Sequence, residues 1–148
     1  MIHVVADASV AIKWVFPFRD DEEDCAKAVA LIEGFTRGAA RLMEPPHWLA
    51  EVTAVIARKS PATARRDIGI LCALRVPVVD TPDLYALACE LAAATGEHAF
   101  DTLYHAVALL TPDCTLVTAD ERYYNKARKA GAVVLLRDFD PAAGERST

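Results

Sequence analysis

The stretch Thr115-Leu116-Val117-Thr118-Ala119-Asp120-Glu121-Arg122 joins a short apolar segment to an acid at its end. Residues 115–118 are predicted to form a buried strand, and Asp120 lies where the chain leaves that strand and enters a helix. In open parallel sheets, ligands bind outside the carboxyl ends of the strands. Asp120 is therefore a candidate ligand-binding residue.

The same arrangement opens the chain. Residues 2–6 form an apolar run, and Asp7 ends it. An aspartate after a strand often serves only as a turn residue or helix cap, and that explanation stays open for Asp7 and Asp120 alike. If the two strands are neighbours, however, both carboxylates reach the same edge of the sheet.

Apolar runs alternate with amphipathic segments along the whole chain. Strands are predicted at residues 2–6, 41–43, 76–79, 115–118 and 133–136, and the proline in the third is typical of a sheet edge. Alternating strands and helices predict an α/β fold, a three-layer α/β/α sandwich around a mostly parallel sheet. Residues 1–140 are predicted to form one domain, followed by a loose tail at 141–148.

Composition fits an ordinary folded protein. Of the 148 residues 53% are apolar, which is enough for a core without disulfides or structural metal. The apolar runs are too short for a bilayer span and no signal sequence is recognised, so a cytoplasmic location is expected. Four scattered cysteines are expected to stay reduced. The net charge of −5 argues mildly against nonspecific nucleic-acid binding, but bound metal would invert the local charge.

Two further acids are candidates for the same site. Glu51 lies within an apolar stripe on a helix predicted to follow Pro45-Pro46. A buried acid needs a partner, and the alternative to a functional role is a salt bridge to Lys13 or an arginine. Asp101 begins another predicted helix, where an acid also complements the helix dipole.

The four acids together favour a metal site. Like charges about 5 Å apart cost ~3 kcal/mol per pair at an effective dielectric constant of about 20. A divalent cation removes that penalty, and Mg²⁺ and Mn²⁺ prefer oxygen ligands. Such a cation activates water and stabilises a leaving oxygen, which is the chemistry of phosphodiester hydrolysis. Asp7, Asp101 and Asp120 are the expected metal ligands, and Glu51 is a further ligand or orients the attacking water.

Other side chains near these acids have supporting roles to test. Ser9 and Thr118 each lie two residues from a strand-end aspartate, where a hydroxyl can orient a carboxylate or can simply cap a helix. Arg122 and Lys126 follow Asp120, and they are candidates for binding the phosphate backbone of a substrate. Ordinary solvated helix faces would also contain such basic residues.

Several short motifs together resemble PIN-domain proteins, and most of all the VapC-like toxins of toxin–antitoxin pairs. The motifs are Asp7-Ala-Ser9-Val-Ala-Ile-Lys-Trp14, Pro45-Pro46 leading to Glu51-Val52, Ala99-Phe100-Asp101-Thr-Leu-Tyr104, and Leu116-Val117-Thr118-Ala-Asp120-Glu-Arg. The resemblance covers residue 2 to about residue 136.

This resemblance implies a five-stranded parallel sheet between helices and a ribonuclease that depends on Mg²⁺ or Mn²⁺. The family's acidic quartet maps onto Asp7, Glu51, Asp101 and Asp120, and its hydroxyl positions map onto Ser9 and Thr118. An RNA substrate, a homodimer and a small antitoxin that covers the active site are also implied.

Two kinds of alternative were weighed against a nuclease. The first is a metal-binding or regulatory module, or a phosphatase, on a similar sheet. A phosphoacceptor receiver needs an acidic pair after the first strand, and Asp7 stands alone; a haloacid-dehalogenase phosphatase needs an aspartate where Ser9 stands; a metal-dependent adhesion site needs a serine at Ala11. The second is a folded PIN-like module that acts only through protein contacts, which sequence does not exclude.

Overall fold

The computed structural model describes residues 1–16 and 24–143. Its sheet contains strands β1 (Ile2–Ala6), β2 (Ala40–Leu42), β3 (Cys114–Thr118) and β4 (Val133–Leu135) in the order β2-β1-β3-β4. Every neighbouring pair is parallel, so all the strands end at the same edge. Of the predicted tail, residues 144–148 lie outside the described residues.

The prediction of a fifth strand at residues 76–79 is wrong. An isolated parallel bridge joins Glu44 to Val78 there. The Glu44 N–H donates to the Pro77 carbonyl at 3.0 Å, and the Val79 N–H donates to the Glu44 carbonyl at 2.9 Å. Because Pro77 has no N–H, it cannot extend this pairing into a ladder. The sheet therefore has four strands and a bridge beside its β2 edge.

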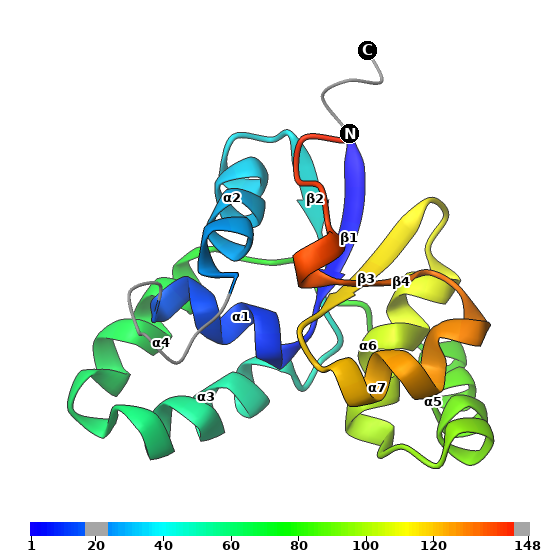
Figure 1. The fold of residues 1–148 in the computed structure, drawn as a ribbon. Helices are drawn as coiled ribbons and strands as arrows, with labels where there is room; N and C mark the ends of the chain where they lie inside the picture. The colour runs from blue at the N-terminus through cyan, green and yellow to red at the C-terminus, as the bar shows by residue number, and fades with distance from the viewer. Residues whose placement is uncertain (17–23, 144–148) are drawn as a thin grey trace.

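Helices cover both faces of the sheet, as the alternating sequence pattern predicts (Figure 1). Helix α1 contacts β1 and β3 on one face and α2 contacts β2, whereas α6 contacts β1 and β3, with α5 packed against it, and α7 contacts β4. The α-helices are α1 (Ala8–Val15), α2 (Cys25–Thr36), α3 (Trp48–Lys59), α4 (Ala64–Ala73), α5 (Pro82–Thr95), α6 (Ala99–Leu110) and α7 (Glu121–Ala127). Short 3-10 turns are η1 (Pro61–Thr63), η2 (Arg128–Ala130) and η3 (Leu136–Asp138).

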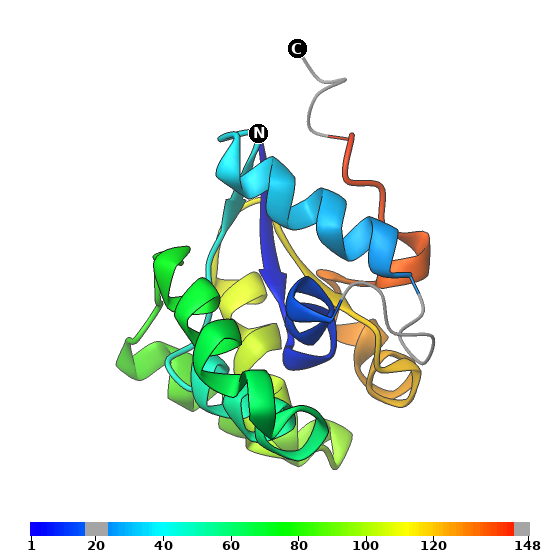
Figure 2. The ribbon, with the colours of Figure 1, turned by 90° about the vertical axis from the view of Figure 1, so that its left-hand side faces the viewer.

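Helix α3 lies beyond the carboxyl end of the sheet, where it packs against α1 and α4 (Figure 2). Its residues Trp48, Val52 and Ile56 are buried at helical spacing, which explains why this face turns inward. Glu51 of the same helix is partly buried and accepts a hydrogen bond from Tyr104 of α6. None of the described helices is long and apolar enough to cross a membrane.

The two central strands form the floor of the core. Val4, Val5 and Ala6 of β1 and Leu116, Val117 and Thr118 of β3 are buried. Continuous burial, without alternation, is expected of parallel strands that are covered on both faces. The buried central strands therefore fix the positions of the residues that follow them, Asp7 and Asp120.

A buried histidine links α6 to α7 and to the turn before β4. The Nε2 of His105 lies 2.7 Å from the Gly131 carbonyl, to which it donates, so Nδ1 accepts from the Tyr123 hydroxyl at 2.9 Å. Burial lowers the pKa of His105, which favours this neutral form. The histidine is thus a satisfied core residue that joins the helices on this face.

The Tyr123→Phe variant should test the energetic value of this link. It removes the hydroxyl that donates to the buried Nδ1 of His105, and we expect the free energy of unfolding to fall by about 1–2 kcal/mol. Urea denaturation at pH 7.5 measures the change. Tyr124→Phe, a partly buried tyrosine on the same helix, is the matched control. Equal stability of the two variants would contradict the prediction.

Candidate active site

Asp7 lies at the end of β1, where hydrogen bonds hold both of its carboxylate oxygens. Oδ1 accepts from the Ser9 N–H at 2.9 Å and from the Ser9 hydroxyl, and Oδ2 accepts from the Thr118 hydroxyl. The same hydroxyls accept from the next turn of chain: Ser9 from the Ala119 N–H at 2.9 Å and Thr118 from the Asp120 N–H at 3.0 Å. The predicted hydroxyl positions therefore both contact Asp7 and tie it to the end of β3.

Strand register brings Asp7 and Asp120 to the same place. Ala6 pairs with Val117, and the Asp7 N–H still reaches the Val117 carbonyl at 3.3 Å. One step further along each strand, Asp7 lies beside Thr118, and Asp120 follows two residues later. Asp7 then caps α1, and Asp120 caps α7 by accepting from the Tyr123 N–H at 3.0 Å. Helix capping is thus a real role of both residues, and it leaves them at the strand ends.

Glu51 faces this site from α3, and its partners are a tyrosine and a histidine. Its Oε2 accepts from the Tyr104 hydroxyl at 2.9 Å, and its Oε1 lies 3.6 Å from Nε2 of His47. The alternative of a salt bridge to an arginine or lysine does not occur within the described residues. Tyr104 belongs to α6, so this contact joins the two helices across the end of the sheet.

Asp101 lies in the first turn of α6 and is half-buried. Burial raises the pKa of its carboxyl, and the charges of Glu51, Asp120 and Glu97 raise it further, against an opposing effect of His98. For Asp7, burial raises the pKa from the ordinary 3.8 to about 6, opposed by the hydrogen bonds from Ser9 and Thr118 and aided by the charge of Asp120. The four predicted acids therefore gather at one end of the sheet, close enough to repel one another.

Sequence reasoning missed a fifth acid, Glu44. Its carboxyl is completely buried, and Oε1 accepts from the Ala6 N–H at 3.0 Å, one residue before Asp7. Oε2 has no hydrogen-bond partner among the described residues. Burial raises its pKa well above the usual range, the Ala6 hydrogen bond opposes this, and the charge of Asp7 adds to it. Its position just after β2 matches the rule that identified Asp7 and Asp120.

The oxygen donors fit a hydrated hard cation better than a closed protein cage. In the described part of the chain, no group of three or more His, Cys, Asp or Glu side chains is arranged to hold a metal ion by itself. Mg²⁺ commonly takes only one or two carboxylates and keeps several waters, so it does not require three or more protein ligands in one closed set. Asp7, Asp101 and Asp120 as its ligands remain a prediction.

The basic residues after Asp120 have a buried partner. Nη2 of Arg122 and Nζ of Lys126 each lie 3.1 Å from a carboxylate oxygen of Glu97, whose side chain is 2% exposed. Glu97 precedes α6, so these pairs fasten α7 to the start of the helix that carries Asp101. A structural role for Arg122 and Lys126 was not foreseen, because Glu97 has no sequence signal for burial. Substrate binding by the two remains a prediction.

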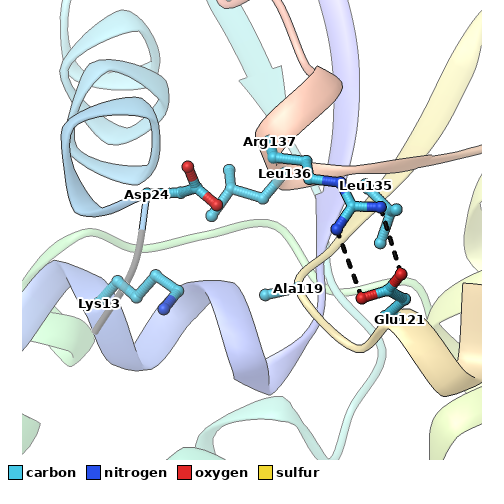
Figure 3. A pocket seen from close by; sticks show the side chains of 7 residues that line it. All are labelled: Lys13, Asp24, Ala119, Glu121, Leu135, Leu136 and Arg137. Atoms are coloured by element: carbon cyan, nitrogen blue, oxygen red, sulfur yellow. Dashed lines mark hydrogen bonds and ion pairs between the residues drawn. The ribbon is translucent and has the colours of Figure 1, made fainter. Parts of the chain in front are cut away.

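A pocket lies on the other side of the turn after β3, between α1, α7 and η3 (Figure 3). Glu121 and Arg137 form a two-pronged ion pair in its wall, with both N–O distances at 3.3 Å. Its lining residues are Lys13, Asp24, Ala119, Glu121, Leu135, Leu136 and Arg137. None of the four predicted acids lines it, so this pocket is separate from the acidic cluster.

Comparison with known proteins identifies a family. The family model described as the PIN domain matches residues 4–129, which covers all four predicted acids. No match was found among curated proteins.

Replacement of Asp7 should reveal the cost of burying its charge, to which the charge of Asp120 adds. The folded protein keeps the Asp7 proton up to about pH 6, whereas an ordinary aspartate loses it near 3.8. Stability from this group is therefore complete below pH 3.8 and is lost as the pH rises through 6. In EDTA at pH 8, Asp7→Asn should raise the free energy of unfolding by at most about 3 kcal/mol, measured by urea denaturation. Asparagine also caps helices well.

The gain should shrink as the pH falls below 6, and added Mg²⁺ should stabilise the parent more than the variant. Asp113→Asn serves as control, because Asp113 is exposed and precedes β3 at the opposite edge of the sheet. A parent protein with constant stability between pH 4 and 8 would refute this account of Asp7.

Proposed function

Because the chain belongs to the PIN-domain family, whose members are generally metal-dependent nucleases, we propose that it is an endoribonuclease that requires Mg²⁺ or Mn²⁺. One observation supports this most. Asp7, Glu51, Asp101 and Asp120 gather at the strand ends, and within the described residues no lysine or arginine forms an ion pair with any of them. Repelling carboxylates that lack a protein cation are suited to an added one.

The proposed reaction is hydrolysis of an RNA phosphodiester by water. The water oxygen bonds to phosphorus, the bond to the 3′ oxygen breaks, and the products carry a 5′-phosphate and a 3′-hydroxyl. A bound divalent cation would make water a better nucleophile and stabilise negative charge on the leaving oxygen. Asp7, Asp101 and Asp120 would hold the cation, with Asp7 oriented by the hydroxyls of Ser9 and Thr118.

Glu51 has a different setting from the aspartates. The Tyr104 hydroxyl fixes its Oε2, and His47 lies 3.6 Å from Oε1. A carboxylate held in this way can accept a hydrogen bond from the attacking water and orient it. Glu51 is therefore assigned to the water or to a further cation contact.

The proposed biological role rests on the resemblance of the sequence motifs to VapC-like toxins. The motifs around Asp7, Glu51, Asp101 and Asp120 support a VapC-like toxin, with a cytoplasmic location, a homodimer and an antitoxin that covers the acids. Growth arrest on expression, relieved by the product of an adjacent short reading frame, would be the expected behaviour. Growth that is unaffected by the parent protein would refute the toxin role and leave the nuclease to be tested separately.

Substitution of the acids tests the reaction itself. Asp101→Asn and Asp120→Asn should each reduce Mg²⁺-dependent cleavage of a labelled RNA by more than about 100-fold, since even residues that only support metal ligands cost 10–100-fold. EDTA should abolish cleavage by the parent, and Mn²⁺ should restore it. Asp113→Asn should cut like the parent, and circular dichroism should show that every variant is folded. Full activity in either variant would exclude a catalytic role for the aspartate that it replaces. If the parent protein cuts no RNA, the alternative of a non-catalytic PIN module is favoured.

The phosphate-binding role of Arg122 has a closely matched control. Arg122 is 68% exposed and pairs with a buried acid, and Arg66 is 70% exposed and pairs with the buried Asp67 on α4. A guanidinium has five N–H donors, so the ion pair to Glu97 leaves others for a phosphate. Arg122→Gln should raise the RNA concentration for half-maximal cleavage severalfold, and the salt dependence should weaken by about 0.7 in log–log slope.

Lys126→Gln should act in the same direction, and Arg66→Gln should not. Each single variant leaves Glu97 with one basic partner, which limits the loss of stability. If Arg66→Gln raises the RNA concentration for half-maximal cleavage as much as Arg122→Gln does, Arg122 and Lys126 have no specific role in substrate binding.

A further inference from the structure

An exposed aromatic ring lies directly beside the acidic cluster. Phe100 is 54% exposed and occupies the first turn of α6, one residue before Asp101. A single exposed phenylalanine is common on protein surfaces and needs no explanation in itself. Phe100 differs from such a residue in two respects: it precedes a proposed metal ligand, and two histidines contact its ring and its backbone.

Two histidines from different parts of the chain brace Phe100. The ring of His98 lies 4.8 Å from the Phe100 ring at 56°, and the ring of His47 lies 5.3 Å away at 35°. Both also fix its backbone: the Phe100 N–H donates to Nδ1 of His98 at 3.1 Å, and Nε2 of His47 donates to the Phe100 carbonyl at 2.7 Å. The hydrogen bonds fix the backbone of Phe100 and the two histidine rings contact its side chain, so fewer conformations have to be lost on binding.

The same histidine connects the ring to Glu51. His47 lies 4.8 Å, ring to ring, from Tyr104, whose hydroxyl donates to Glu51, and Nε2 of His47 is itself 3.6 Å from Glu51. Phe100 thus neighbours Asp101 along the chain and Glu51 through a single side chain. A group stacked on this ring would be held at the edge of the acidic cluster.

The surroundings of Phe100 favour a small flat ligand over a protein surface. Its ring neighbours are histidines, and a carboxylate follows it along the chain, so the local surface is polar. Protein interfaces generally need a broad buried patch. The other large exposed apolar residues of the described chain are Leu110, at the opposite end of α6, and, on other elements, Met1, Ile70, Val78 and Tyr85.

The charge balance also calls for a contact that is not electrostatic. The chain has a net charge of −5, the site itself is acidic, and Glu97 partly neutralises Arg122 and Lys126, although both have donors left for a phosphate. Nucleobases stack on aromatic side chains through their π faces, and this attraction does not depend on net charge. Bases within a duplex are already stacked and cannot reach such a ring.

We propose that Phe100 is a stacking platform for one nucleobase of single-stranded RNA, which places the neighbouring phosphodiester at the acidic cluster. This inference rests on the proposed function and narrows its substrate to unpaired RNA. Phe100 sets specificity in this scheme, and the acids perform the chemistry.

Binding and cleavage should be measured separately with the full chain. Binding uses a short single-stranded RNA oligonucleotide with 2-aminopurine at successive positions, whose fluorescence is quenched by stacking, and Asp7→Asn as the background to prevent cleavage. We expect Phe100→Leu to weaken binding about tenfold and to abolish the quenching at one position. Phe100→Trp should retain both, because it keeps an aromatic face.

Tyr85→Leu is the matched control. Tyr85 is 48% exposed and lies near the start of α5. Phe100 and Asp101 lie just beyond the opposite end of that helix, at the start of α6. The Tyr85→Leu variant should bind the oligonucleotide like the parent. Binding of a fully paired RNA in the Asp7→Asn background, and its cleavage in the parent background, should not depend on the side chain at position 100. Thermal unfolding should establish that Phe100→Leu is folded.

The outcomes separate this inference from the nuclease proposal. If the parent cuts RNA and Phe100→Leu binds and cuts it equally well, or Tyr85→Leu loses as much, the stacking platform is refuted and the nuclease stands. If residue 100 governs stacking but the parent cuts no RNA, the nuclease is refuted and the platform stands. Failure of the oligonucleotide to bind any variant would refute the platform.

Discussion

The parallel pairing of β1 with β3 is the constraint on which the site depends. It places Asp7 beside Thr118 and brings Asp120 to the same edge, and the hydroxyls of Ser9 and Thr118 lock the two strand ends together. A shift of the register by one residue would turn every side chain of the strand to the opposite face. Because both strands are buried on both faces, their apolar packing resists such a shift.

The pairing of β1 with β3 brings several carboxylates together at the carboxyl ends of the strands, where their charges lower the stability of the fold. Glu44 is completely and Asp7 partly buried, and the pKa of Asp101 is raised by burial and, in addition, by its acidic neighbours. Uncompensated charge of this kind lowers stability, which proteins commonly accept where function needs it. Neutral donors soften the cost: the Tyr104 hydroxyl for Glu51, and the Ala6 N–H for Glu44.

The site is assembled from both halves of the molecule. β1 and α3 supply Asp7 and Glu51, whereas α6 and the turn after β3 supply Asp101 and Asp120 (Figure 1). The Tyr104–Glu51 hydrogen bond and the rings of His47 and Phe100 join α3 to α6 across the carboxyl end of the sheet. The basic residues of α7 hold the start of α6 through Glu97. The proposed catalytic residues and the contacts that join the helices therefore belong to the same elements.

The sequence by itself determined the α/β class, the acids at the ends of β1 and β3, and the four carboxylates to be examined together. These follow from local signals: apolar runs, amphipathic periodicity, and the residue that ends each run. The prediction of a fifth strand at residues 76–79 was wrong. The apolar residues of this segment suggested a strand, but the segment containing Pro77 forms only one bridge. Sequence reasoning passed over Glu44, although the strand-end rule applied there.

Only the tertiary structure decided the partners. Tyr104 and His47 contact Glu51, Glu97 captures Arg122 and Lys126, and two histidines fix Phe100 beside Asp101. The pairs Tyr104–Glu51, His47–Phe100 and Arg122–Glu97 join residues that are far apart in the chain, whereas periodicity and capping report only on a few neighbouring residues. Their existence depends on how helices α3, α6 and α7 pack around the strand ends, which local sequence does not encode.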